Sequence, residues 1–296
     1  MKILIATEKA FAPIAVKGIR EIVEKAGHEL VLLENYKKPE ELLEAIKEVE
    51  AVIIRSDKVT PAVVEAGKKL KIVVRAGAGY DNVDLPACTK AGIVVMNTPG
   101  QNSNAVAELA IGMMIYAFRN MFQPGTGIEL RGKTLGLAAC GNVGQCVKKI
   151  SEGFGMQVAI YDPYLKMEGK VEKLEDLFAQ NQIVSLHMPS TKETKGLIGY
   201  DLVMKMPKNG LLVNTARKEI INEEEVIKAM KERKDLKYVT DIAPASKEFE
   251  EFKGRYFTTP RKMGAETEEA NVNSGLAAAR QIVAFFATGD IKFKVN

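Results

Sequence analysis

The sequence predicts an α/β protein with two domains, each built on a parallel β-sheet that carries helices on both faces. Short runs rich in Val, Ile and Leu alternate with amphipathic segments along the whole chain, a pattern typical of parallel sheets. The alternation stops at Asn97-Thr98-Pro99-Gly100 and starts again at Thr134, after a long segment rich in Ala, Met and Ile. We therefore expect two series of strands and helices.

The first series contains five predicted strands with helices between them. The strands are expected at residues 2–6, 29–33, 51–54, 72–74 and 93–96. The helices are expected at residues 15–26, 40–47, 61–69 and 85–91, and a longer helix at about 105–122.

The second series predicts strands at residues 134–138, 157–161, 182–186, 210–214, 238–240 and 256–258. A long helix at 268–287 and a closing strand at 291–295 follow. The natural place for these last two elements is back on the first sheet. We therefore expect a first domain of residues 1–99 and 273–296, with a second domain of residues 100–272 inserted into it.

Composition excludes several classes of protein. Among 296 residues, 42 basic and 38 acidic side chains give a net charge of +4, which is too small and too scattered to indicate a nucleic-acid partner. Cys88, Cys140 and Cys146 have no paired spacing, so neither a disulfide framework nor a metal site is expected. No signal peptide and no apolar run of membrane-spanning length is visible. We expect a cytoplasmic protein without a membrane partner.

The glycine-bearing turn after the first strand of the second series is the strongest functional signal. Gly141 and Gly144 follow the run 134–138, and Asp162 ends the next apolar run. This order is typical of a Rossmann-like dinucleotide-binding unit, in which a helix N-terminus faces the pyrophosphate and an acid binds the ribose. The charge of Asp162 favours NAD over NADP. The first glycine of the motif is replaced by Ala139, and an ordinary strand–turn–helix is the alternative.

Three further segments lie just beyond predicted strand ends. The turn Arg75-Ala76-Gly77-Ala78-Gly79 offers backbone N–H groups to an anion, unless it is a plain glycine turn. Arg217 can grip a carboxylate with two parallel hydrogen bonds, the alternative being a surface salt bridge. His187 is either a catalytic base or a wall residue, which lines the site and hydrogen-bonds backbone. We favour the wall residue, because the sequence places no carboxylate to orient the imidazole. The other histidine, His28, is expected to be structural.

Together these segments resemble the D-isomer-specific 2-hydroxyacid dehydrogenases. The resemblance rests on motifs in their family order: Ile54-Arg55-Ser56, Val74-Arg75-Ala76-Gly77, Asn97-Thr98-Pro99 with Asn102, and Val106-Ala107-Glu108. Within the family, the chain looks most like the short phosphoglycerate dehydrogenases. The resemblance implies an NAD-binding domain inserted into a flavodoxin-like substrate domain, and a homodimer formed through residues of about 100–125. It also implies oxidation of D-3-phosphoglycerate, a small phosphorylated hydroxy acid, in serine biosynthesis.

The family's catalytic arginine, glutamate and histidine do not all have counterparts here. The arginine corresponds to Arg217, whereas Ser246 stands where the glutamate would be. Counting back from Gly264 places Lys262 at the histidine position, and counting forward from Pro260 places Arg261 there. We choose Lys262, because the sequence after Gly264 matches the family better. A free lysine has a pKa of about 10.4, so as a base it would need burial or neighbouring cations.

The resemblance and the glycine turn together imply two sets of binding residues. The predicted cofactor site consists of Ala139, Gly141, Asn142, Val143, Gly144, Asp162, His187, Pro189, Thr194, Thr215, Ala216, Arg217, Asp241 and Gly264. The predicted substrate site consists of Arg55, Ser56, Arg75, Ala76, Gly77, Ala78 and Gly79. Arg55 would contact the substrate phosphate, and the amides of residues 77–79 its carboxylate. Both sets are expected at the carboxyl ends of strands, in the crevice between the domains.

Two other functions remain open from the sequence. One is a reductase of another small 2-keto acid, such as hydroxypyruvate or glyoxylate. The other is a non-catalytic NAD-sensing interaction protein, favoured by the missing glutamate and histidine. The retained Arg217, Arg55 and anion loop favour an enzyme.

Overall fold

The computed structural model describes residues 1–167 and 169–296, which fold into two compact units. The first unit comprises Met1–Asn102 and Ala265–Asn296, and the second unit comprises Ser103–Gly264. Each unit contains one sheet in which every pair of neighbouring strands is parallel. The predicted fold class is therefore confirmed. The labels "substrate domain" and "NAD-binding domain", and their boundaries at 99/100 and 272/273, stay predictions.

The sheet of the first unit has five strands in the order β2-β1-β3-β4-β5, the flavodoxin-like order. Its strands are β1 (Lys2–Thr7), β2 (Glu29–Glu34), β3 (Ala51–Ile54), β4 (Ile72–Arg75) and β5 (Val94–Asn97). Three of the five contain a run of Val, Ile, Leu or Ala that is buried on both faces. Such runs are typical of parallel strands covered by helices on both sides.

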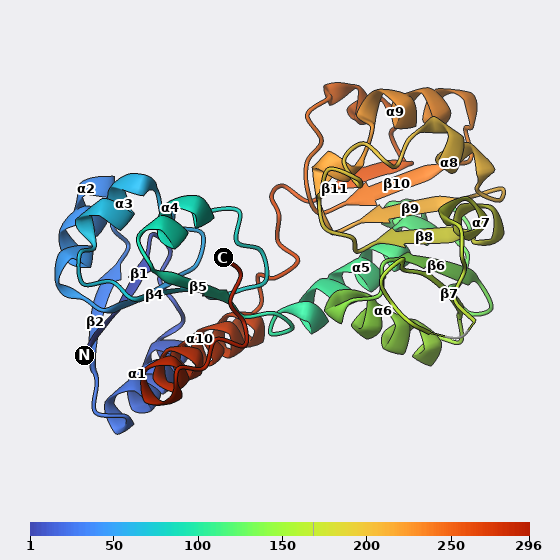
Figure 1. Ribbon diagram of the computed structural model, residues 1–296. Helices are drawn as coiled ribbons and strands as arrows, with labels where there is room; N and C mark the ends of the chain where they lie inside the picture. Colours follow the sequence, from blue (N-terminus) through green and yellow to red (C-terminus); the bar gives the residue numbers. More distant parts are fainter. Residues whose placement is uncertain (168) are drawn as a thin grey trace. The chain divides into compact units, whose positions relative to one another are not determined.

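Helices cover both faces of this sheet (Figure 1). On one face α1 (Pro13–Lys25) and α10 (Glu268–Thr288) lie side by side and pack on alternate strand residues such as Ile3 and Ile5. On the other face α2 (Pro39–Ala45), α3 (Pro61–Ala66) and α4 (Leu85–Lys90) pack on the intervening residues such as Leu4. The last long helix therefore belongs to the first unit, although it follows the second unit in sequence.

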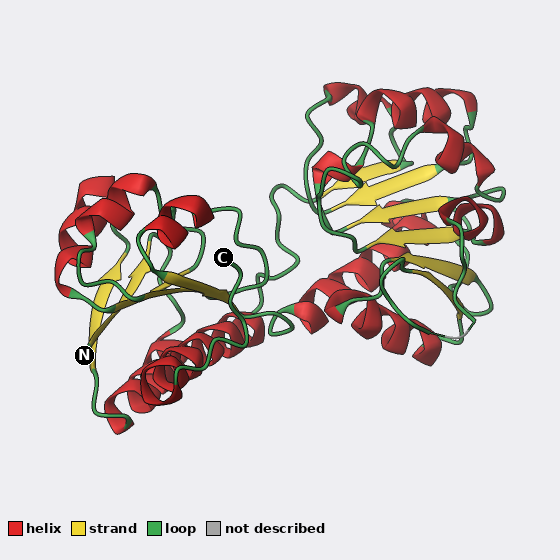
Figure 2. Ribbon diagram, in the orientation of Figure 1, coloured by secondary structure: helices red, strands yellow, loops and turns green. Residues whose placement is uncertain are grey.

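The second unit has a six-stranded sheet in the order β11-β10-β9-β8-β6-β7. Figure 2 shows these strands with helices on both sides of the sheet. The strands are β6 (Thr134–Ala138), β7 (Gln157–Tyr161), β8 (Ile183–Leu186), β9 (Leu211–Asn214), β10 (Lys237–Thr240) and β11 (Tyr256–Thr258). The chain moves from β6 outward to β7 and then crosses to β8 on the other side of β6. Ligands of such sheets bind near this reversal, at the carboxyl ends of the strands.

Two hydrophobic layers enclose the second sheet. One contains α5 (Ser103–Phe118) and α6 (Asn142–Gly153), and the other contains α7 (Leu174–Gln180), α8 (Tyr200–Lys205) and α9 (Glu223–Glu232). Both layers pack on the sheet, so its central strands β8 and β9 are entirely buried.

One predicted helix is too long, and one predicted strand is wrong. The helix expected at 105–122 stops at Phe118, because Asn120, Met121 and Phe122 have positive φ angles of 54°, 53° and 58°. The strand expected at 291–295 is a turn, in which Lys294 N donates to Ile291 O (3.0 Å). This segment makes only an isolated antiparallel bridge with β5, between Lys294 and Met96.

Two features are absent from the described residues. In residues 1–167 and 169–296, no helix is long and apolar enough to cross a membrane. In the same ranges, no three His, Cys, Asp or Glu side chains are grouped as a metal site would require.

Candidate active site

Most of the predicted cofactor residues follow the carboxyl ends of the second unit's strands. The glycine turn follows β6, Asp162 follows β7, His187 follows β8 and Asp241 follows β10. Because all six strands are parallel, these residues share one edge of the sheet. Backbone hydrogen bonds connect the loops there: Ala139 N donates to Tyr161 O (2.8 Å) and His187 N to Ala138 O (2.9 Å).

The glycine turn has the geometry that its sequence predicted, with one strained residue. Ala139 has a φ of +76°, where an L-residue other than glycine costs about 1–2 kcal/mol. A Cβ on Gly144 would lie 2.6 Å from Ala139 O, so only glycine lets α6 begin this close to β6. A Cβ on Gly141 would meet nothing within 4 Å. That side of the turn is therefore open to a ligand, and the first N–H groups of α6 face no earlier helical carbonyl.

Asp162 has a local role that the sequence analysis missed. Its Oδ2 accepts from Cys140 N (2.9 Å), and its Oδ1 accepts from Tyr164 N (2.9 Å) and Leu165 N (3.2 Å). The carboxylate thus holds the glycine turn against the end of β7. Asp-Pro-Tyr after a strand was the available signal, because Asp side chains often accept from a backbone N–H two residues on.

Three buried polar atoms at this edge have no partner within the described ranges of the chain: His187 Nε2, Thr215 Oγ1 and Asp241 Oδ1. Buried polar atoms in proteins are nearly always hydrogen-bonded. Orphaned atoms on three neighbouring loops therefore indicate a place for a polar ligand. Together with the open face at Gly141, they fit the predicted dinucleotide.

The buried imidazole of His187 supports the wall interpretation over the catalytic one. Burial lowers the pKa of His187 to about 4. A histidine with so low a pKa is neutral at neutral pH and is a weak proton acceptor there. It can still offer a hydrogen bond to a ligand through Nε2.

Arg217 and Lys262 lie side by side in the second unit. Lys262 Nζ donates to Ala216 O at 2.8 Å, and Arg217 Nη1 donates to the same oxygen at 2.9 Å. The two cations proposed for catalysis therefore meet at one carbonyl, although 45 positions separate them in the sequence. Lys262 is exposed and Arg217 is partly buried.

A buried carboxylate completes this cluster. Asp241 is fully buried, and its Oδ2 accepts from Gly264 N (2.9 Å). Burial raises the pKa of Asp241, whereas the charges of Lys262 and Arg217 and the N–H groups of Gly264 and Met263 act in the opposite direction. Both cations act on Asp241, and two cationic head groups close together can bind an anionic substrate.

Side chains at the ends of β9 and β10 hold the Arg217 loop in place. Asn214 Oδ1 accepts from Ala216 N (3.0 Å), and Asn214 Nδ2 donates to Arg217 O (3.0 Å). Thr240 Oγ1 donates to Asn214 O (2.9 Å). The sequence analysis did not single out Asn214 or Thr240 for this role. Their polarity at the ends of apolar strands was the only signal.

The segment that carries Ser246 is held from a different element. Glu223, the first residue of α9, accepts from Ala245 N (2.9 Å) and Ser246 N (2.8 Å). Ser246 Oγ accepts from Glu248 N (3.3 Å) and so caps a short 3₁₀ turn. The predicted cofactor residues Pro189 and Thr194 belong to another closed turn, in which Thr194 Oγ1 donates to Pro189 O (2.6 Å).

The predicted substrate residues lie at the carboxyl ends of β3 and β4 in the first unit. The Arg55 guanidinium donates to the carbonyls of Lys9 (3.2 Å) and Ala10 (3.3 Å) and to Asn271 Oδ1, and it lies 5.2 Å from the centre of the Phe11 ring. Ser56 is exposed. Arg55 is thus held in one position by neutral acceptors, and the carboxylates of Asp57 and Glu266 lie near enough to act on its positive charge.

The loop after β4 has the shape of an anion cradle. Gly77 has a φ of +146°, and a Cβ there would overlap the Arg75 guanidinium. In the part of the chain that the structure describes, the N–H groups of Gly77, Ala78 and Gly79 donate to no acceptor. Ala76 differs, because its N–H donates to Ile54 O (2.8 Å).

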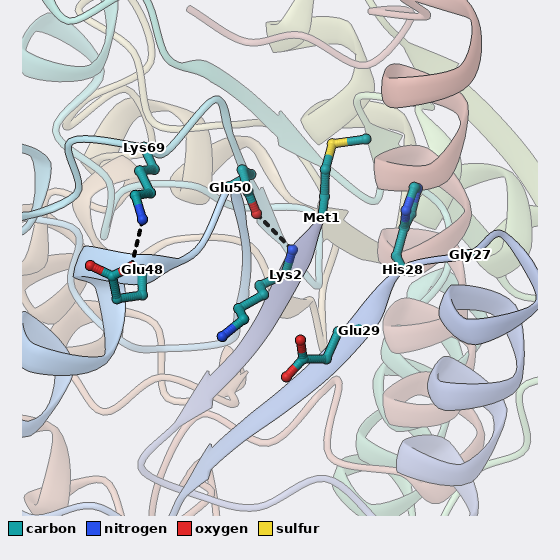
Figure 3. A pocket seen from close by; sticks show the side chains of 8 residues that line it. All are labelled: Met1, Lys2, Gly27, His28, Glu29, Glu48, Glu50 and Lys69. Carbon is teal, nitrogen blue, oxygen red and sulfur yellow. Dashed lines mark hydrogen bonds and ion pairs between the residues drawn. The ribbon is translucent and has the colours of Figure 1, made fainter.

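A hollow of about 690 Å³ in the first unit lies at the wrong edge of the sheet (Figure 3). It is lined at the amino ends of β1 and β2 by exposed polar residues. Lys69 and Glu48 form an ion pair across it, and Lys2 N donates to Glu50 Oε2 (2.6 Å). None of the predicted site residues lines it, and we do not assign it a role in the chemistry.

Comparison with known proteins identifies the class. The chain belongs to the D-isomer-specific 2-hydroxyacid dehydrogenases, because residues 7–296 match the catalytic domain of that family. The family is one of enzymes, as the sequence predicted.

Three relatives show which enzymes of the family the chain is similar to. The crystal structure of an NAD⁺-bound 3-phosphoglycerate dehydrogenase from Entamoeba histolytica is 60% identical, with a TM-score of 0.94 over 100% of this chain and 98% of that one. D-3-phosphoglycerate dehydrogenase of Methanocaldococcus jannaschii is 37% identical over 82% of this chain and 51% of its own length. Hydroxypyruvate reductase of Thermotoga maritima is 34% identical over 86% of this chain and 90% of its own length. This chain thus spans about half the length of the archaeal relative.

Proposed function

We propose that this protein is an NAD-dependent D-3-phosphoglycerate dehydrogenase, which oxidises D-3-phosphoglycerate to 3-phosphohydroxypyruvate, the first step of phosphorylated serine biosynthesis. The observation that carries the proposal is the 60% identity, over its full length, to an NAD⁺-bound enzyme of that name. The cluster of Arg217, Lys262 and Asp241 supports it, because a 2-hydroxy acid needs a cation for its carboxylate and a group that accepts its hydroxyl proton.

The cofactor residues of the second unit fit NAD. The N–H groups at the start of α6 would bind the pyrophosphate, and Asp162 would use its remaining lone pairs for a ribose hydroxyl. The orphaned atoms of His187, Thr215 and Asp241 supply further hydrogen bonds. When bound, the cofactor supplies the ring that accepts a hydride.

Arg217 and Lys262 divide the work at the reacting carbon. The Arg217 guanidinium binds the carboxylate and stabilises the C2 oxygen as the alcohol becomes a carbonyl. The Lys262 amine accepts the C2 hydroxyl proton. The Ala216 carbonyl between them keeps both head groups in place.

The first unit supplies anion recognition. The free N–H groups of Gly77, Ala78 and Gly79 bind the carboxylate. Arg55 binds the phosphate, with Arg75 beside it. A phosphate is recognised well by a guanidinium that is already fixed in position.

A reductase of another small 2-keto acid is the second candidate. The relation to hydroxypyruvate reductase favours it, because that protein is matched over 90% of its own length. Arg55 separates the two candidates, since an unphosphorylated substrate has no group for it to bind.

We also propose a homodimer formed through residues of about 100–125 and a location in the cytoplasm. The end of α5 supports the dimer. Phe122 is 69% exposed and packs edge-to-face against Tyr116, with ring centres 5.1 Å apart. It borders a shallow hollow of about 400 Å³ lined by Ile115 and Arg119. An exposed aromatic ring beside a hollow is suited to contact with a second copy of the chain.

One assay tests the function. NADH formation from D-3-phosphoglycerate is measured by absorbance with a ketone trap, and NADH consumption is measured with 3-phosphohydroxypyruvate, hydroxypyruvate and glyoxylate. We expect the phosphorylated pair to give the highest kcat/KM. Arg55→Leu should lower that value by about 100-fold, because a charge-assisted bidentate contact is lost. Preference of the wild-type protein for hydroxypyruvate or glyoxylate would contradict the proposal and favour the second candidate.

A further inference from the structure

A buried carboxylate at the carboxyl edge of the first unit's sheet takes no part in the steps above. Asp57 is only 2% exposed, and it accepts three hydrogen bonds. Tyr36 Oη donates to its Oδ1 at 2.8 Å, Glu8 N donates to the same oxygen at 2.7 Å, and Arg55 N donates to its Oδ2 at 3.0 Å. Charge-assisted hydrogen bonds of this kind offset the cost of burying an anion.

The three donors come from three different strand ends. Glu8 follows β1, Tyr36 follows β2, and Arg55 follows β3. The order of these strands in the sheet is β2-β1-β3. Asp57 therefore joins the carboxyl ends of three neighbouring strands. Tyr36 is 5% exposed, and burial together with its bond to Asp57 raises the pKa of its hydroxyl, so it remains a donor.

The main chain of Arg55 is held from both sides. Its N–H is fixed by Asp57, while its carbonyl accepts from Arg75 Nε (3.0 Å) and Asn82 Nδ2 (3.2 Å). Asn82 Nδ2 also donates to Asp57 O (2.6 Å). One network thus connects the buried Tyr36–Asp57 pair to both arginines of the proposed phosphate site.

The side chain of Arg55 depends on that main-chain position. Its guanidinium reaches the carbonyls of Lys9 and Ala10 and the Phe11 ring, all in the loop that begins with Glu8. Glu8 itself is fixed by Asp57. The Asp57 carboxylate therefore fixes both the main chain of Arg55 and the loop that its guanidinium contacts.

We infer that Asp57 and Tyr36 are positioning residues that hold Arg55 ready to bind the phosphate of the substrate. The inference rests on the proposed role of Arg55. Neither residue touches the substrate. They fix the guanidinium before the substrate binds. Binding then needs no change in its geometry and costs less side-chain entropy.

Tyr36→Phe is the sharpest test, because it removes one hydroxyl and leaves the charge of Asp57. We expect the KM for 3-phosphohydroxypyruvate to rise about fivefold to tenfold, as loss of a hydrogen bond to a charged group allows, with kcat nearly unchanged. Both constants for hydroxypyruvate should stay as in the wild type. Tyr200→Phe is the matched control, since Tyr200 Oη also donates to a carboxylate, Glu232 (2.6 Å), but in the second unit.

Equal loss with both substrates would mean a general structural role and would overturn the inference, as would no change with either. Asn82→Ala is the second variant. It removes the two bonds to the carbonyls of Arg55 and Asp57 without touching the buried pair. It should raise the same KM by a smaller factor, about twofold to threefold.

A binding measurement separates this inference from the proposed function. Inorganic phosphate is titrated into the cofactor-free protein and followed by ³¹P NMR. Arg55→Leu should abolish binding and Tyr36→Phe should weaken it. A wild-type protein inactive on every phosphorylated substrate would contradict the proposed function, yet the phosphate titration would still decide the inference. Phosphate binding that is equal in the wild type and Tyr36→Phe would refute it.

Discussion

At the residue scale, the proposed chemistry depends on where single charges lie. Arg217 and Lys262 share the carbonyl of Ala216, and the buried Asp241 lies beside them. The Asp241 carboxylate adds a negative charge to this cluster although its side chain is buried. Because Lys262 is exposed, removal of its charge should affect the reaction more than the fold.

Lys262→Met tests the proton acceptor. We expect kcat to fall by about 10²- to 10⁴-fold, the usual contribution of a positioned acid–base group, while the dissociation constant of NADH stays within about twofold of the wild type. Stopped-flow turnover and fluorescence titration measure the two quantities. Lys208→Met, an exposed lysine before β9, is the control. Wild-type turnover of Lys262→Met across the pH range would remove Lys262 from the mechanism.

His187 predicts a pH dependence of stability. Its pKa is about 4 in the folded protein and about 6.5 in an unfolded chain. Between these values the unfolded state binds more protons, so the folded state loses stability as pH falls, by on the order of 3 kcal/mol in total. Above about pH 6.5 the imidazole is neutral in both states, so this loss of stability is absent there.

Urea unfolding of the cofactor-free protein at several pH values checks this prediction. His187→Gln removes the titrating group. The wild type should therefore lose more stability than the variant between pH 7 and pH 4. The difference between their free energies of unfolding should change by about 3 kcal/mol over this range. The difference at pH 7 is the internal reference. Parallel pH curves for the two proteins would show that His187 does not titrate as described.

At the element scale, the β6–α6 turn depends on very close backbone packing. The space at Gly144 is limited by the carbonyl of Ala139, a backbone atom that cannot rotate away. Ala139 in turn holds a positive φ that glycine would adopt without strain. The turn therefore has one essential glycine and one costly alanine.

Gly144→Ala should destabilise the protein by about 1–3 kcal/mol through overpacking and weaken NADH binding. Gly153→Ala is the matched control at the other end of α6, where a Cβ meets nothing within 4 Å. It should be neutral or stabilise by about 0.5–1 kcal/mol. Chemical denaturation gives both values. Similar changes in the two variants would contradict the close approach at Gly144.

Element boundaries show how much of the fold the sequence could predict. The apolar runs placed every strand from β1 to β11 within a residue or two. Most of these strands are buried on both faces, and strands buried in this way are continuously apolar. The end of α5 and the segment 291–295 were wrong. Composition there permits a helix and a strand, whereas the backbone turns at Asn120 and after Ile291, and only an isolated bridge joins the last segment to β5.

At the scale of the whole molecule, the proposed dimer is the property open to direct measurement. Phe122→Glu places a charge in the exposed apolar surface at the end of α5. We expect sedimentation velocity to show a dimer for the wild type and a monomer for this variant, because the charge would have to be buried without a partner. Tyr164→Glu, at a residue 90% exposed, is the control. A monomeric wild-type protein would contradict the proposal.

By itself, the sequence determined the two parallel sheets and the glycine turn with Asp162. Local patterns carry these features, since hydrophobic period and strand-end position can be read from neighbouring residues. The choice of Arg217 and Lys262 as the proposed catalytic groups came from the resemblance to the family. Only the tertiary structure decided that Asn214 and Thr240 hold the loop of Arg217, and that Glu223 holds the segment of Ser246. It also decided that Asp57, bonded to Tyr36, fixes the main chain of Arg55. These contacts join residues from different strand ends, and strand order, which brings them together, is set by the packing of the whole sheet.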